Sequence, residues 1–356
     1  MTNYFTFLPL LIVALLMSQT SVLATNTEAN DDAKSESPID IMGTVADHDY
    51  FTFFGTKLYL PRLFLWKDAN GITQFSTYKS TKKALASGEF EQVDYAIKPV
   101  NGSILIDFSL TSHLIYFWFG LGALALYIMF ASSRYKKGIG TTTAPKGAFQ
   151  NLFELFYEFV RDEVAKPNIE GKKYKKYVPY LFTMFMSITF MNVFGLLPWA
   201  ATATADITVT AVLALFTFFI TQFSGTKDHW QHVFWFPGVP LGVKFLMIPV
   251  ELIGLFTKPF ALAIRLFANM MSGKIMIIAI LGLIFIFNDM YGSMAAYSVS
   301  IFSVTMTSIL YVLKLLVALL QAYIFTLLSA VFIGMAAEEH EHDHIHDDHI
   351  HAEQSV

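Results

Sequence analysis

The sequence predicts an all-α polytopic membrane protein with five membrane helices, including a long, strongly tilted hairpin, and a small β-rich N-terminal exported module. The chain has 356 residues, of which 54% are hydrophobic and 15% charged, with a mean hydropathy of +0.50. Soluble domains carry about 25% charged residues. Apolar runs long enough to cross a bilayer also recur along the chain. Because the chain has no cysteine, disulfides, thiol catalysis and cysteine-ligated metals are excluded.

Residues 1–24 have the pattern of a secretory signal peptide. An apolar stretch from Phe5 to Met17 has the length of a signal core, and residues 22–24 match a small-residue cleavage site. Because no Lys or Arg precedes the apolar stretch, a short uncleaved anchor stays an alternative. In both cases the segment that follows is exported.

The exported part is predicted to divide in two. Residues 25–47 are polar and have the composition of a disordered linker. Residues 48–110 are predicted to form a β-rich module, because they contain short runs rich in aromatic and β-branched residues. These runs are Tyr50 to Phe54, Lys57 to Trp66, Ile72 to Tyr78 and Ile104 to Phe108.

Residues 111–337 form the predicted membrane domain. Membrane helices are expected at 114–131, 178–197, 207–223, 243–287 and 293–337, with an amphipathic surface helix at 148–164. Ten Lys and Arg residues lie within 132–177, whereas the segments 198–206 and 288–292 contain none. The positive-inside rule therefore places the N-terminus outside and the basic segment and the C-terminus in the cytoplasm. We expect the membrane to be the inner (plasma) membrane, with the N-terminus in the periplasm.

The last two apolar runs, 243–287 and 293–337, are too long to stand upright in a bilayer. Each would measure about 67 Å as a helix, against a hydrocarbon core of about 30 Å. Each run either breaks into two spans or tilts strongly. Because neither contains a clear polar turn, we expect two tilted helices that form a hairpin, with Asn288 to Gly292 as its outer turn.

Arg265 lies within the first of these runs, where an arginine costs at least about 2.5 kcal/mol. Glu251, Lys258 and Arg265 are spaced by seven residues, so they share one helix face to within about 40°. Asn269 follows Arg265 by four residues and lies close to that face. Ionisable residues within a membrane usually line an ion or proton path. The alternative is a static polar contact between helices.

The second run carries a matching pair, since Lys314 and Gln321 are again seven residues apart and share a face. Lys274, nine residues beyond Arg265, lies about half a turn round the first helix. Two neighbouring helices thus carry five polar or ionisable residues (Arg265, Asn269, Lys274, Lys314 and Gln321) among apolar ones.

These residues resemble the family of subunit a of the F-type ATP synthase membrane sector, in its bacterial form with an extended exported N-terminal region. The resemblance covers roughly residues 107 to 340. Its matching blocks, in the order of the family, are residues 190–198 (FMNVFGLLP), 204–210 (TADITVT), 258–270 with Arg265 and Asn269 in the pattern RLFANM, 320–325 (LQAYIF) and 335–340 (MAAEEH).

The resemblance implies a stator that packs against a rotating c-ring, with peripheral stalk b subunits and membrane lipids as further partners and without cofactor or nucleic acid. Two aqueous half-channels would carry protons to and from c-ring carboxylates, coupling proton flow to ATP synthesis. Arg265 matches the essential arginine, whose permanent charge attracts the deprotonated carboxylate. Gln321 and Asn269 match positions near it, and Glu251 matches an acid towards the cytoplasmic half-channel. Asp107 matches an acid at the outer mouth only loosely; an ordinary charge at the end of a strand is the alternative.

Two lysines depart from the family pattern. Lys274 stands where many members have Glu, and Lys314 where many have His. Two buried ammonium groups repel each other and lose hydration. One hypothesis is that the pair forms a cationic relay or gate in the outer half-channel. The alternatives are that both extend to the membrane surface, or pair with a carboxylate such as Asp206 or Asp107.

The tail, residues 338–356, is rich in histidine and is expected in the cytoplasm. Weak candidates for Zn²⁺ or Ni²⁺ ligands are His340, His342, His344 and His346. A solvated tail without specific metal binding is the alternative.

A different function is also open at this point, namely a secondary ion transporter or a proton channel with an intramembrane cationic gate. A transporter would show internal repeats, and no second copy of the Arg265 block occurs in the chain. On its own the chain is not expected to be an enzyme.

Overall fold

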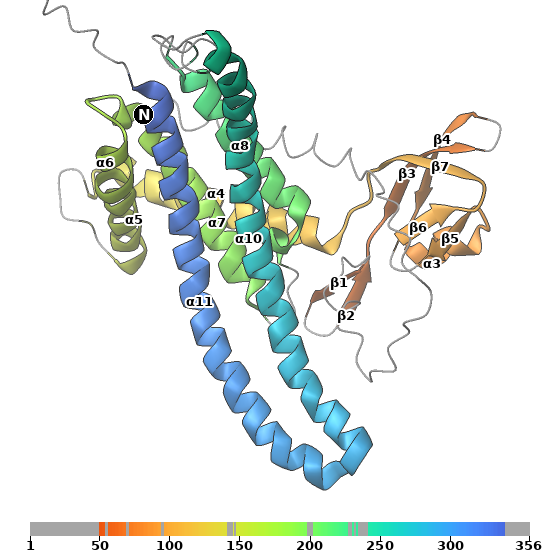
Figure 1. Cartoon of the computed structure of the whole chain (residues 1–356). Coiled ribbons are helices and arrows are strands. Elements are labelled where there is room, and N and C mark those ends of the chain that lie inside the picture. Colours follow the sequence, from red (N-terminus) through yellow and green to blue (C-terminus); the bar gives the residue numbers. More distant parts are fainter. Residues whose placement is uncertain are drawn as a thin grey trace, which may run out of the picture.

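The computed structural model describes residues 50–53, 56–68, 71–93, 96–140, 145, 147–197, 202–226, 230, 233 and 241–338. Five of its helices are long and apolar enough to cross a membrane. These helices are α4 (Ser112–Lys136), α7 (Tyr174–Gly195), α8 (Ile207–Ser224), α10 (Leu241–Tyr291) and α11 (Ser293–Ala337). With the small β-sheet region before them (Figure 1), they confirm the predicted fold class. The predicted signal peptide, linker and His-rich tail lie outside the described residues, except for Glu338.

Helix α7 is the centre of the bundle. Its apolar side chains are buried nearly all round, as expected of a helix that contacts protein rather than lipid on every side. It packs between α4 and α11, and the core is filled by large side chains from all three helices. Fully buried members of this core are Phe117, Leu124, Leu181, Met184, Ile188 and Phe325.

The predicted surface helix, 148–164, is regular only in its first part. It begins as α5 (Ala148–Phe159), widens into the π-helix η2 (Val160–Ala165) and ends as α6 (Lys166–Asn168). The wider turn buries Val160 and Val164 completely in the segment that packs against α7. Beside them, the guanidinium of Arg161 donates to both carboxylate oxygens of Asp162, at 2.6 and 3.1 Å, which lowers the pKa of Asp162.

Helices α10 and α11 form the expected hairpin, with lengths of about 76 and 68 Å. The predicted outer turn, Asn288 to Gly292, was too long. The helix continues through Tyr291, and Gly292 alone makes the turn, with φ of +80°. Glycine takes this left-handed conformation without the steric penalty of a Cβ atom. Pro249 and Pro259 both lie inside α10, and neither ends it.

The β-rich module contains seven short strands and one helix among its described residues. The strands are β1 (Tyr50–Phe53), β2 (Thr56–Tyr59), β3 (Arg62–Asp68), β4 (Thr73–Tyr78), β5 (Phe90–Val93), β6 (Ala96–Pro99) and β7 (Gly102–Asp107). They form two hairpins, β1–β2 and β5–β6, and an antiparallel sheet of order β4-β3-β7. Helix α3 (Thr81–Ala86) and the β5–β6 hairpin contribute to one core, in which Phe64, Trp66 and Phe90 are buried.

Two details of the module differ from the expectation. The predicted run from Lys57 to Trp66 is split at Leu60 and Pro61, because proline has no N–H to donate to a strand ladder. The last strand, expected at Ile104, begins at Gly102. At the surface of the module, the hydroxyl of Tyr78 donates to the Glu89 carboxylate at 2.6 Å. Burial and this carboxylate raise the pKa of Tyr78.

Candidate functional site

Arg265 lies near the middle of α10, on a face that the described part of the chain leaves uncovered. Its neighbours Leu262, Ala263 and Leu266 are buried against the bundle, whereas the Arg265 side chain is exposed. Within the described ranges, no carboxylate lies within ion-pair distance of the guanidinium. The charge therefore points out of the bundle, towards the place where lipid or another subunit would lie.

One turn further along, a polar contact joins the two arms of the hairpin. The amide of Asn269 on α10 donates to the Gln321 side-chain oxygen on α11, at 3.3 Å. Gln321 is buried, and its own Nε2 finds no acceptor in the described part of the chain. The structure thus brings together two of the predicted site residues a single helical turn from Arg265.

A second buried polar group, the Asn192 side chain of α7, forms a hydrogen bond to α11. Asn192 is fully buried, and its Nδ2 donates to the backbone oxygen of Ala318, at 3.2 Å. Its Oδ1 accepts from the hydroxyl of Thr204 at 2.7 Å, in the short 3₁₀-helix η3 (Ala203–Ala205). Asn192 was not among the predicted site residues. An asparagine inside an apolar span was the available signal.

The two predicted lysines lie beyond Arg265 towards the turn of the hairpin. Lys314 on α11 extends across Gly273 on α10, so closely that a Cβ atom at Gly273 would overlap its Cε and Nζ atoms. Gly273 immediately precedes Lys274, so the two lysines belong to one region. Both are partly buried.

The predicted acids outside the hairpin have local hydrogen bonds. Asp107, at the end of β7, accepts from the backbone N–H of Ser109 at 2.8 Å. Asp206 caps α8 by accepting from the N–H of Thr208 at 2.8 Å. No described contact joins either of them to the lysines, and each of these bonds suits an ordinary turn or cap.

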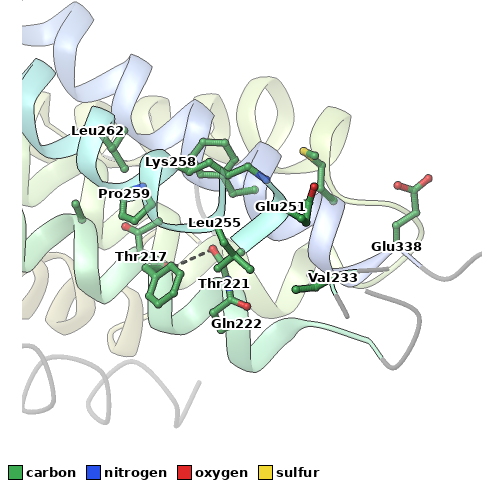
Figure 2. A pocket seen from close by; sticks show the side chains of 14 residues that line it. Thr217, Thr221, Gln222, Val233, Glu251, Leu255, Lys258, Pro259, Leu262 and Glu338 are labelled. Carbon is green, nitrogen blue, oxygen red and sulfur yellow. Dashed lines mark hydrogen bonds between the residues drawn. The ribbon is translucent and has the colours of Figure 1, made fainter. Parts of the chain in front are cut away.

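A cavity of about 260 Å³ lies between α8, α10 and the end of α11. Along α10 it lies before Arg265, whereas the two lysines lie beyond that residue. Figure 2 shows Glu251 and Lys258 on its wall together with Thr217, Thr221 and Gln222 of α8. The Lys258 ammonium lies 5.7 Å from the ring centroid of Phe332. With Glu338 at its end, the cavity therefore combines three charged groups with the hydroxyl and amide groups that water or a proton path requires.

The cavity reaches close to Arg265. Leu262, which also lines it, precedes Arg265 by three residues, about 4.5 Å along the helix. The Gln222 side-chain oxygen is buried and has no hydrogen-bond partner among the described residues, so it is available to a water molecule in the cavity. The cavity thus extends along α10 from Glu251 to Leu262, within one helical turn of the arginine.

Metal binding finds no support in the described part of the chain, where three or more His, Asp or Glu side chains do not gather at any point. The tail candidates, His340, His342, His344 and His346, lie outside the described residues.

These features define a polytopic membrane protein with ionisable groups along a tilted hairpin. The chain belongs to the ATP synthase A chain family, since the model of that family matches residues 114–334, more than half of the chain. This match confirms the resemblance found in the sequence.

Curated relatives agree with the family match. ATP synthase subunit a of Chloroherpeton thalassium is 47% identical over 239 residues, which cover 66% of this chain and 69% of the relative. Subunit a of Anaeromyxobacter sp. is 43% identical over 249 residues, covering 68% and 57%. Subunit a of Chlorobium phaeobacteroides is 44% identical over 244 residues, covering 67% and 68%.

Proposed function

We propose that this chain is the stator subunit a of an ATP synthase membrane sector, and that it passes protons to and from the carboxylates of a rotating c-ring. The observation that carries the proposal is Arg265, an exposed cation on a long hairpin, without an ion-pair partner in the described chain. A permanent charge placed in lipid is costly unless a partner neutralises it. A carboxylate that arrives on another subunit supplies that partner transiently.

The role of Arg265 follows from its fixed charge. A guanidinium does not lose its proton in a protein, so it favours the ionised form of each passing carboxylate and promotes proton release there. The same charge repels a proton that would cross directly between the two half-channels. Asn269 and Gln321, hydrogen-bonded to each other at 3.3 Å, hold the hairpin arms together one turn away and line the path.

The inner half-channel is assigned to the 260 Å³ cavity, with Glu251 and Gln222 on its wall. In this arrangement the N-terminus and the β-rich module lie in the periplasm and α11 ends in the cytoplasm, in the inner membrane. Peripheral stalk b subunits and lipids are the further partners. The chain contributes a proton path, while ATP chemistry belongs to other subunits of the complex.

The test of Arg265 is Arg265→Ala, measured as ATP-driven proton pumping in inverted membrane vesicles. We expect coupled pumping to be lost and passive proton leak to rise. Arg161→Ala is the control, because Arg161 lies in the surface segment η2 and pairs with Asp162. Full coupling in Arg265→Ala would refute the proposal.

Because the chain has no cysteine, a single introduced cysteine can be used to test the inner half-channel. Thr221→Cys introduces a thiol on the cavity wall, and Leu215→Cys introduces one on the exposed side of the same helix, away from the cavity. A membrane-impermeant thiol reagent applied from the cytoplasmic side should label the first and not the second. Equal labelling, or labelling of Thr221→Cys only from the periplasmic side, would contradict the assignment.

For the outer half-channel we propose that Lys274 and Lys314 form a cationic relay or gate. The packing of Lys314 across Gly273, next to Lys274, supports this role. Lys314→Met keeps the length of the side chain and removes its charge. Reduced ATP-driven pumping is the expected result, and unchanged pumping would exclude the relay.

A further inference from the structure

A second hollow has no residue of the hairpin in its lining. It has a volume of about 520 Å³ and lies between α4, α5 and α7. One helix face from each contributes, for example Tyr127 of α4, Leu152 of α5 and Phe190 of α7. Apart from Tyr127 and Thr189, its lining is apolar. None of these residues belongs to the proposed proton path.

Aromatic contacts mark the two ends of the groove. At one end, the rings of Phe119 and Phe194 meet edge to face, with centroids 5.0 Å apart. At the other, Phe130 and Phe149 meet at 6.5 Å. The lining runs from Ala123 to Phe130 on α4 and from Met186 to Phe194 on α7, so the groove is about 12 Å long. This length fits within one leaflet, half of a hydrocarbon core of about 30 Å. A membrane-spanning helix of a partner would need a groove more than twice as long.

The end of the groove at Phe130 and Phe149 is positively charged. The Arg134 guanidinium lies 4.9 Å from the Phe130 ring centroid, and its Nη1 is 3.6 Å from the point where a Cβ on Gly147 would stand. It therefore lies between the ends of α4 and α5, directly beyond Phe130 and Phe149. Lys136 and Lys137 follow and are exposed. Basic groups at this depth attract anionic lipid headgroups.

We propose that this groove binds one anionic phospholipid, with an acyl chain between α4, α5 and α7 and the phosphate beside Arg134. The hydroxyl of Tyr127 donates to the Phe149 backbone oxygen at 3.0 Å, which fixes the start of α5 against α4 and keeps the groove open. The binding joins the surface helix to the bundle through the lipid. It does not depend on the route that protons take.

The test uses the full-length chain with the subunits that accompany it, solubilised from its membrane and reconstituted in vesicles of equal phosphatidylglycerol and phosphatidylcholine. After detergent washing, the retained lipids are measured by mass spectrometry. Arg134→Gln should lower the ratio of phosphatidylglycerol to phosphatidylcholine about fivefold. Lys175→Gln, which removes an exposed charge at the start of α7, should leave the ratio unchanged.

A second pair of variants tests the acyl-chain part of the groove. Leu152→Trp fills the groove, whereas Leu155→Trp makes the same change on α5 at an exposed position outside it. Only Leu152→Trp should lose retained phosphatidylglycerol. Equal retention in wild type, Arg134→Gln and Leu152→Trp would overturn the proposal. Loss of a protein subunit from Leu152→Trp with its phosphatidylglycerol intact would also overturn it, and would assign the groove to a partner helix.

Discussion

Replacing Asn192 by leucine tests whether buried polar contacts hold the second arm of the hairpin against the bundle. The change removes two hydrogen bonds, from Nδ2 to the Ala318 oxygen at 3.2 Å and from the Thr204 hydroxyl to Oδ1 at 2.7 Å. Side-chain hydrogen bonds between membrane helices contribute about 0.6 kcal/mol on average and about 1.7 at most. The two bonds therefore contribute about 1 to 3 kcal/mol to the free energy of unfolding.

A further loss arises at Thr204, which is fully buried and would keep a hydroxyl without an acceptor. Such a group costs about 1 to 3 kcal/mol, while the apolar contacts of leucine offset about 1.5 kcal/mol. We expect Asn192→Leu to lower the free energy of unfolding by about 2 kcal/mol, measured by titration with sodium dodecyl sulfate in mixed micelles.

A double-mutant cycle with Thr204→Val separates this mechanism from general damage to the core. If the Thr204–Asn192 bond is responsible, the double variant should be less destabilised than the sum of the single variants by about 1 kcal/mol. Wild-type stability of Asn192→Leu, or strict additivity in the cycle, would refute the reasoning.

Three further changes follow from close contacts. Gly334→Ala should destabilise the protein by about 1 to 3 kcal/mol in the same titration, because a Cβ there meets the backbone oxygen of α6; Gly122→Ala, in open space, should not. Gly273→Ala should displace Lys314 and reduce ATP-driven pumping while leaving assembly intact. The raised pKa of Tyr78 means that its contribution to module stability is present below pH 10.0 and lost as pH rises through the folded-state pKa; Tyr78→Phe should remove this pH dependence.

Each of these expectations can fail in a specific way. Equal stability of Gly334→Ala and Gly122→Ala would mean that α11 and α6 are further apart than described. Normal pumping in Gly273→Ala would separate the position of Lys314 from function. An identical alkaline unfolding profile for Tyr78→Phe and wild type, followed by circular dichroism, would show that Tyr78 does not govern this step.

Hydropathy and spacing were sufficient to predict the five helices and the hairpin, because burial in lipid leaves a long apolar signal in the sequence. The ends of elements were harder to predict. Asn288 and Asp289 are typical of turns, yet both extend α10, where their exposed side chains lie beyond the apolar run. The π-helix at Val160–Ala165 had no signal of its own, since it depends on how two valines fit against α7.

For the site, too, positions along a single helix could be predicted from the sequence, whereas contacts between helices could not. A spacing of seven residues predicted one face for Glu251, Lys258 and Arg265. The first two line the cavity, whereas Arg265 does not and is exposed. The contact between Asn269 and Gln321, by contrast, required the register between two helices, which periodicity along one helix does not contain. The space that Gly273 leaves for Lys314 depends on the same register.

The two arms of the hairpin are supported along only part of their length. Towards the N-terminal half of α10 and the C-terminal half of α11, they pack on α7 and α8. Met270 and Ala318 are buried together with Ala205 in a small apolar cluster. Beyond these two residues, Figure 1 shows the hairpin extending past the other helices to its turn. The hairpin is therefore held by the other helices at one end and extends freely from them at the other. A sideways force on the turn would bend the hairpin most where it leaves the other helices, which is where Arg265, Asn269 and Gln321 lie.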